Sequence, residues 1–209
     1  MNLKSVFFSN SQKKKHIFYN HEDAALSLSN NISPLLPSIH THSIIVFCIG
    51  TDRSTGDSLG PIIGSILHEN MNTSPFNVYG TLEKPIHAVN LEEQLEKVNK
   101  NHENPFIIAI DACLGRVNDV GSLQVGKGAI KPGAAVRKEL PSVGHIHIKG
   151  IVNVSGFMEF FVLQNTRLHI VMSMARTIAQ GIEMTANQYS NGINYKQQLT
   201  FKRIKSNSE

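Results

Sequence analysis

The sequence contains little cysteine and no long hydrophobic run. Two cysteines, Cys48 and Cys113, occur among 209 residues, too few for the disulfide framework of a secreted protein. Each adjoins an apolar run, so we expect both to be small buried hydrophobic residues. No stretch approaches the roughly 20 apolar residues of a membrane-spanning helix. The apolar residues 6–8 are too few for a signal peptide, and a cytosolic protein is expected.

Several motifs of common enzymes are also absent. The ten histidines are scattered, and neither an HExxH nor a CxxC pattern occurs, so a zinc site has no support. His147 is kept only as a candidate metal ligand. No Gly-x-Ser-x-Gly pattern surrounds Ser54 or Thr55, which disfavours a serine hydrolase. The glycines of residues 115–133 match neither a P-loop nor a dinucleotide fingerprint, and we interpret them as turns.

Positive charge is concentrated at the two ends of the chain. The formal net charge is +4, with +2 in residues 1–40 and +3 in residues 190–209. Residues 41–189 contain 12 basic and 13 acidic residues, so we expect no groove for nucleic acid there. The predicted organisation is an N-terminal extension (1–40), an α/β domain (41–189) and a basic C-terminal tail (190–209).

Two apolar runs, 44–49 and 106–110, are typical of central parallel strands buried on both faces. Helical patterns alternate with them, which predicts a three-layer α/β/α domain with a mostly parallel sheet. The methionines and aromatic residues of the last two helices are expected in the core. The predicted strands are 43–49, 77–81, 105–110, 122–125 and 145–155; the predicted helices are 22–28, 59–71, 91–101, 156–164 and 167–187.

Two aspartates follow the two apolar runs. Asp57 lies in a loop bracketed by glycines, and Asp111 comes directly after residues 106–110. If the two strands are parallel neighbours, both carboxylates emerge at one sheet edge, where they can share a proton, activate water or hold a metal. Simpler interpretations remain: Asp57 can cap the following helix, Asp111 can start a turn, and Asp52 can pair with Arg53.

The two aspartate motifs together resemble those of the germination protease of bacterial spores. They read Gly-Thr-Asp-Arg-Ser-Thr-Gly-Asp-Ser-Leu-Gly-Pro over residues 50–61 and Ile-Ala-Ile-Asp-Ala over 108–112. The likeness is greatest to a smaller related group, the YyaC sporulation proteins, and runs through most of residues 43–185. Residues 153–168, Asn-Val-Ser-Gly-Phe-Met-Glu-Phe-Phe-Val-Leu-Gln-Asn-Thr-Arg-Leu, belong to it. The motif of the germination protease differs in having Asn where this chain has Asp52 and Pro where it has Gly56.

This resemblance implies a phosphorylase/hydrolase-like fold, shared with the hydrogenase-maturation proteases. It also implies a sporulation-associated peptidase in which Asp57 and Asp111 activate water. Asp52, Arg53 and Asn153 are the implied substrate-binding or supporting residues. The expected partner is a protein or peptide, with neither nucleic acid nor membrane, and the oligomeric state is left open. No cofactor is expected.

Two alternatives stay open. One is a non-catalytic regulatory or binding protein of sporulation that keeps the fold. The other is a metal-dependent maturation-type protease, because the hydrogenase-maturation proteases hold nickel with acidic residues and a histidine. In that alternative a divalent metal binds at the site, and His147 matches the histidine.

Overall fold

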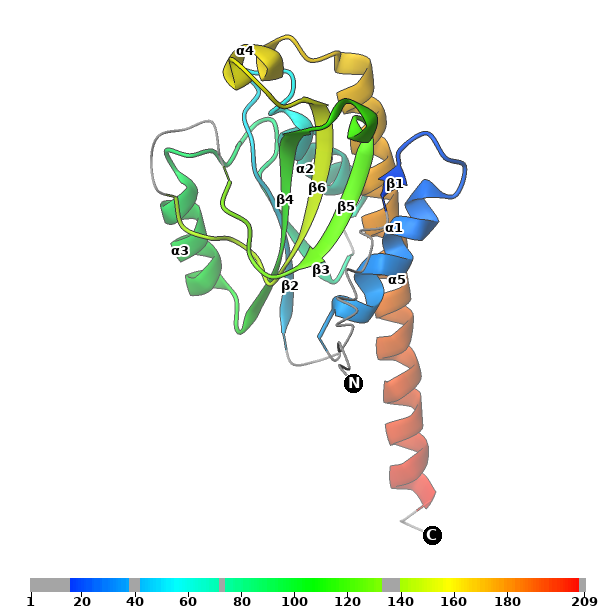
Figure 1. The fold of residues 1–209 in the computed structure, drawn as a ribbon. Coiled ribbons are helices and arrows are strands. Elements are labelled where there is room, and N and C mark those ends of the chain that lie inside the picture. The colour runs from blue at the N-terminus through cyan, green and yellow to red at the C-terminus, as the bar shows by residue number, and fades with distance from the viewer. Residues whose placement is uncertain (1–15, 38–41, 72–73, 133–139, 207–209) are drawn as a thin grey trace, which may run out of the picture.

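The structure is a computed structural model that describes residues 16–37, 42–71, 74–132 and 140–206 (Figure 1). The remaining parts of the predicted extension and tail, and Gly133, lie outside the described residues. Short 3₁₀ turns follow α1 and β4, at Ser33–Leu35 and Val117–Asp119. The elements are β1 (Ile17–Phe18), α1 (Ala24–Ile32), β2 (Ser43–Cys48), α2 (Leu59–Asn70), β3 (Phe76–Tyr79), α3 (Leu91–Asn101), β4 (Pro105–Gly115), β5 (Ser122–Lys127), β6 (Ile146–Val154), α4 (Glu159–Gln164) and α5 (Leu168–Ser206).

A six-stranded sheet in the order β1-β5-β6-β4-β2-β3 forms the centre of the domain. The four strands β6, β4, β2 and β3 run parallel, whereas β5 is antiparallel to both of its neighbours. Because β2 and β4 are parallel neighbours, their carboxyl ends lie at the same edge of the sheet. This edge is where ligands bind in open α/β sheets.

Helices cover both faces of the sheet (Figure 1). The core on one face joins α1, α2 and α5 to strand residues such as Val46 and Ile110. On the other face α3 packs against Ile45 and Phe47. The predicted three-layer α/β/α class with a mostly parallel sheet is therefore confirmed. No helix among the described residues has the length and apolar character needed to cross a membrane.

Several element boundaries differ from the sequence-based predictions. Strand β4 continues five residues past the predicted end at 110, because it keeps pairing with β6 as far as Gly115 and Val154. Asp111 is therefore inside a strand and does not start a turn. Gly115 and Gly126 also lie in strands instead of turns. Helix α4 begins three residues later than predicted, and α5 continues to Ser206.

Residues 16–37 of the predicted extension contribute side chains to the core. Ile17 pairs with Leu123 at the sheet edge. In α1, Leu28 and Ile32 are fully buried. A Cβ at Gly181 of α5 would lie 2.8 Å from Leu28 Cδ2, so α1 and α5 pack closely.

Replacing Leu28 with alanine is expected to lower the free energy of unfolding by about 2–5 kcal/mol, the range for a buried leucine. Chemical denaturation would measure the change. Leu26→Ala in the same helix is the matched control, because Leu26 is 44% exposed and its truncation leaves no buried cavity. Equal effects of the two substitutions would show that α1 does not pack on α5.

Candidate active site

The loop that carries Asp57 folds back closely on itself. Gly50 has a φ of +150°, and a side chain there would overlap the carbonyl oxygen of Asp57. This approach lets the Thr51 N–H donate to the Asp57 carbonyl at 3.2 Å. Gly60 in turn lets the first turn of α2 rest on the carbonyl group of Ile49. The two glycines therefore fix the Asp57 backbone at the carboxyl end of β2.

Asp57 is not the cap of the following helix. The N-cap of α2 is Ser58, whose hydroxyl donates to the Thr55 carbonyl at 2.7 Å and makes no capping bond. The interpretation of Asp57 as an N-cap is therefore wrong. Its partly buried carboxylate instead lies at the sheet edge, beside the helix N-terminus, where the helix dipole favours negative charge.

Asp111 lies in β4 next to a lysine of the neighbouring strand. In the parallel pairing of β4 with β6, Asp111 is opposite Lys149. Lys149 is in turn opposite Gln124 of β5. Residues opposite each other in a ladder project from the same face, so these three side chains form a row across the sheet. All three are partly buried.

The two aspartates interact electrostatically. Burial raises the pKa of Asp111 to about 8, and the negative charge of Asp57 contributes to the rise. The Lys149 ammonium group and the Ala112 backbone N–H oppose it. Asp111 is therefore protonated at neutral pH. This is the behaviour of one member of a pair of neighbouring carboxylates in a partly dry site.

Asp57 has a different environment. Burial raises its pKa too, but the neighbouring Ser54 hydroxyl favours the charged form and opposes the rise. Ser54 is only 4% exposed, so its hydroxyl is buried beside this carboxylate.

The other predicted site residues do not all join the aspartates. Asp52 and Arg53 are exposed at the tip of the loop, and no ion pair joins them. The Asn153 amide has a structural role. It donates to the Val162 carbonyl at 3.3 Å and to Thr166 Oγ1 at 3.2 Å, which attaches α4 to β6.

His147 lies on β6, with its Nδ1 atom 2.9 Å from the Gly128 carbonyl oxygen. Within the described part of the chain, no group of three or more His, Cys, Asp or Glu side chains could hold a metal ion. The ammonium group of Lys149 beside Asp111 also disfavours a cation there. The donor set at the two aspartates therefore does not fit the nickel site of the maturation-protease alternative.

Sequence reasoning missed Lys149. The sequence does contain one indication of its position, because residues 145–149 alternate with period two and so place Lys149 and His147 on one face of a strand. The pairing of Lys149 with Asp111 depends on the register between two strands, which the alternation does not give. The prediction for the cysteines holds for Cys48, which is buried, but Cys113 is only partly buried. Burial and the charge of Asp111 raise the pKa of Cys113 to about 11, so its thiol stays protonated at neutral pH.

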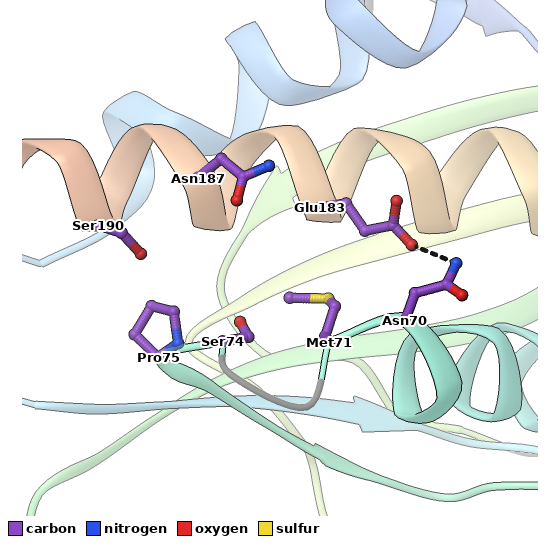
Figure 2. A pocket seen from close by; sticks show the side chains of 7 residues that line it. All are labelled: Asn70, Met71, Ser74, Pro75, Glu183, Asn187 and Ser190. Carbon is purple, nitrogen blue, oxygen red and sulfur yellow. Dashed lines mark hydrogen bonds between the residues drawn. The ribbon is translucent and has the colours of Figure 1, made fainter.

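A small surface pocket of about 150 Å³ lies elsewhere (Figure 2). Asn70 and Met71 at the end of α2 line it together with Glu183 of α5, and Asn70 donates to Glu183 at 2.9 Å. Asp57 precedes the opposite end of α2. Twelve helical residues span about 18 Å, so this pocket is separate from the aspartate site.

Comparison with solved structures defines the class of fold. The [NiFe] hydrogenase maturation protease HycI from Thermococcus kodakarensis KOD1 matches with a TM-score of 0.52 over 77% of this chain and 99% of that chain. The sequence identity is 15%, so the likeness concerns the fold alone. The protein is thus an α/β protein with the fold of a hydrogenase maturation protease.

Sequence comparison then gives the family. Residues 16–181 match the family model described as "Protein of unknown function (DUF1256)". The uncharacterised protein YyaC of Bacillus subtilis (strain 168) is 53% identical over 187 residues, which cover 88% of this chain and 90% of that protein. The chain therefore belongs to the DUF1256 family, as a protein of the YyaC type.

Proposed function

We propose that this chain is a peptidase that uses Asp57 and Asp111 to activate water for peptide-bond cleavage. The observation that carries the proposal is the electrostatic coupling of the two carboxylates at the carboxyl ends of adjacent parallel strands. Two neighbouring carboxyl groups can hold different protonation states, one ionised and the other protonated. One base and one acid near neutral pH are the requirement for hydrolysis without a metal.

In the proposed reaction the ionised Asp57 takes a proton from a water molecule, whose oxygen then bonds to the carbonyl carbon of the peptide. Asp111 donates its proton to the carbonyl oxygen. When the tetrahedral intermediate collapses, the carbon–nitrogen bond breaks and the leaving nitrogen takes the proton held by Asp57. Asp111 recovers its proton from the intermediate, so both carboxyl groups return to their starting states.

Lys149 has a positioning role in this mechanism. Its positive charge opposes the rise in the pKa of Asp111. Without that charge Asp111 would hold its proton more tightly and donate it less readily. Lys149 therefore adjusts the acid without touching the reacting atoms.

The proposed biological setting is the cytoplasm of a sporulating cell, with a protein or peptide as substrate. This part rests on the resemblance of residues 50–61 and 108–112 to the motifs of the spore germination protease. Small acid-soluble spore proteins, the substrates of that protease, are therefore the first substrates to test. No cofactor takes part in the proposed chemistry.

The test is digestion of these spore proteins and of a proteome-derived peptide library by the purified chain, with products identified by mass spectrometry. We expect cleavage that is unchanged by EDTA, because two carboxyl groups supply the acid and the base. A double Asp57→Asn, Asp111→Asn variant purified in the same way controls for contaminating peptidases. Cleavage abolished by EDTA would favour the metal-dependent alternative. Absence of cleavage in every condition would favour the non-catalytic binding protein.

A further inference from the structure

Large apolar side chains are exposed around the short helix α4. Six of the ten exposed large hydrophobic residues in the described structure fall within residues 154–168. Four of them form what we call the α4 patch: Phe157 (91% exposed), Met158 (51%), Phe160 (57%) and Phe161 (54%). The expectation that these methionine and aromatic side chains lie in the core is therefore wrong. A contiguous exposed apolar patch commonly marks a binding surface.

The patch is held in place from beneath. Leu163 is 8% exposed and points into the core, while Asn153 and Thr166 both bond to the Val162 carbonyl oxygen. Met158, at the start of α4, has a left-handed backbone with φ of 58°. That conformation is unfavourable for a bulky residue and is maintained by surrounding structure, typically at functional sites.

The α4 patch adjoins both segments that carry the aspartates. The Gly56 N–H, next to Asp57, donates to the Leu163 carbonyl at 2.8 Å. The Ser155 N–H, just before the patch, donates at 2.7 Å to the carbonyl of Gly115, at the end of β4. Residues 155–163, which lead into and include most of α4, therefore contact both the Asp57 loop and the end of the strand that carries Asp111 (Figure 1).

We propose that the α4 patch binds a large apolar side chain of the peptide substrate, so that the preferred substrates carry Phe, Leu or a similar residue near the cleaved bond. The inference rests on the proposed peptidase function and names the substrate class for that site. The inference is supported by the hydrogen bonds that join residues 155–163 to the two segments containing the aspartates. A peptide that extends from the aspartates along the Asp57 loop would meet α4, because Gly56 is bonded to Leu163, and apolar side chains gain most from burial there.

A membrane surface fits the patch less well than a peptide does. A second copy of the chain would typically bury about 800 Å² per partner, of which about 450 Å² is apolar. The four side chains expose about 500 Å² at about 200 Å² per full side chain, so area does not separate a second copy from a peptide, and the contacts with the aspartate segments favour the peptide. A membrane surface would require basic residues beside the apolar ones, whereas residues 154–168 contain one acidic residue, Glu159, and one basic residue, Arg167.

The experiment measures binding and cleavage separately. Fluorescein-labelled octapeptides with one position fixed as Phe, Leu, Ser or Lys are titrated into full-length Asp57→Asn protein, with fluorescence anisotropy as readout. A Phe157→Ser, Phe160→Ser, Phe161→Ser variant in that background is expected to bind the Phe and Leu peptides about tenfold more weakly and the Ser peptides unchanged. Phe157→Ser alone provides a second variant if the triple variant does not fold. Val89→Ser with Val117→Ser is the control, since both valines are exposed (87% and 73%) outside the patch.

Patch-dependent selection of Phe and Leu peptides supports the inference. The inference is overturned if the Asp57→Asn protein with an intact patch shows no preference for the Phe and Leu peptides. It is also overturned if this preference survives the triple substitution or is lost equally in the valine control. A dimer that dissociates on the triple substitution would assign the patch to a second copy, and patch-dependent sedimentation with phosphatidylglycerol vesicles would assign it to a membrane; each overturns it. Binding is measured in the Asp57→Asn protein and so does not depend on cleavage. A wild-type chain that binds the peptides but does not cleave them would contradict the peptidase proposal alone.

Discussion

The Asp111→Asn variant is expected to lose about 10²- to 10⁴-fold of the proposed peptidase activity, the usual contribution of a general acid. Asparagine has nearly the same shape as aspartic acid but cannot donate the carboxyl proton. The rate constant for cleavage of a library-derived peptide would measure the loss. Glu92→Gln is the control, because Glu92 is an exposed carboxylate of α3, outside the proposed site. Full activity in Asp111→Asn would rule out the two-aspartate mechanism.

The same variant is expected to change how stability depends on pH. Burial raises the pKa of Asp111 to about 8 in the folded protein, compared with about 4 in an unfolded chain. Between these values the folded state holds a proton that the unfolded state has released, so the free energy of unfolding falls as pH rises. The contribution is complete below about pH 4 and is lost as pH rises through about 8.

For the wild type this predicts a loss on the order of 3 kcal/mol between pH 5 and pH 8. Asparagine does not titrate, so Asp111→Asn is expected to remove most of this dependence on pH. Between pH 5 and pH 8 the variant should therefore lose less stability than the wild type loses. Urea denaturation at several pH values would measure this. Parallel slopes for wild type and variant would show that the Asp111 pKa is not raised.

Lys149→Met separates the role of the lysine from that of the aspartate. Removing the positive charge that opposes the rise moves the pKa of Asp111 still higher. The decline of activity at high pH, where Asp111 loses its proton, is therefore expected to shift to higher pH. A purely structural lysine would lower activity without moving this limb of the pH–rate profile.

Gly60→Ala is expected to destabilise the fold by about 3 kcal/mol or more. A Cβ at this position would overlap the backbone carbonyl of Ile49, and a backbone group cannot move aside as a flexible side chain can. Overpacking of this kind usually costs about 1–3 kcal/mol and sometimes more. It outweighs the gain of up to about 1 kcal/mol that alanine normally brings to a helix.

Gly156→Ala is the matched control for this substitution. No atom lies within 4 Å of a Cβ built at Gly156, so we expect a change within about 0.5 kcal/mol, as for other surface positions. Thermal and chemical unfolding would compare the two variants. If neither substitution changed the free energy of unfolding, the close approach of α2 to the end of β2 would not constrain the Asp57 loop.

The sequence predicted those elements whose burial follows from a local pattern. Strand β2 and helix α3 begin where predicted, and α3 also ends there. Runs such as residues 44–48 have no polar residue on either face, so only a central strand accommodates them. The convergence of Asp57 and Asp111 at one sheet edge follows from the same runs, once the strands are taken as parallel neighbours.

What the sequence could not predict depends on contacts between distant segments. The pairing of Asp111 with Lys149 is a matter of register between β4 and β6, which neither strand encodes alone. The burial of Leu28 depends on the long helix α5 lying across α1. Residues 156–164 have core-like composition, yet in the structure α4 is bonded to Asn153 and Gly56 and its aromatic side chains are exposed to solvent.

One hydrogen bond links the aspartate loop to α4: the Gly56 N–H donates to the Leu163 carbonyl. A ligand that displaces α4 is therefore expected to disturb the backbone beside Asp57, and a protonation change that shifts the Asp57 loop is expected to disturb α4. Any such coupling is reciprocal, because thermodynamic linkage makes each event alter the other by the same factor. The affinity of the α4 patch for a ligand that moves α4 should then vary with pH through the titration of Asp57. Binding of such a ligand would be accompanied by uptake or release of a proton at Asp57.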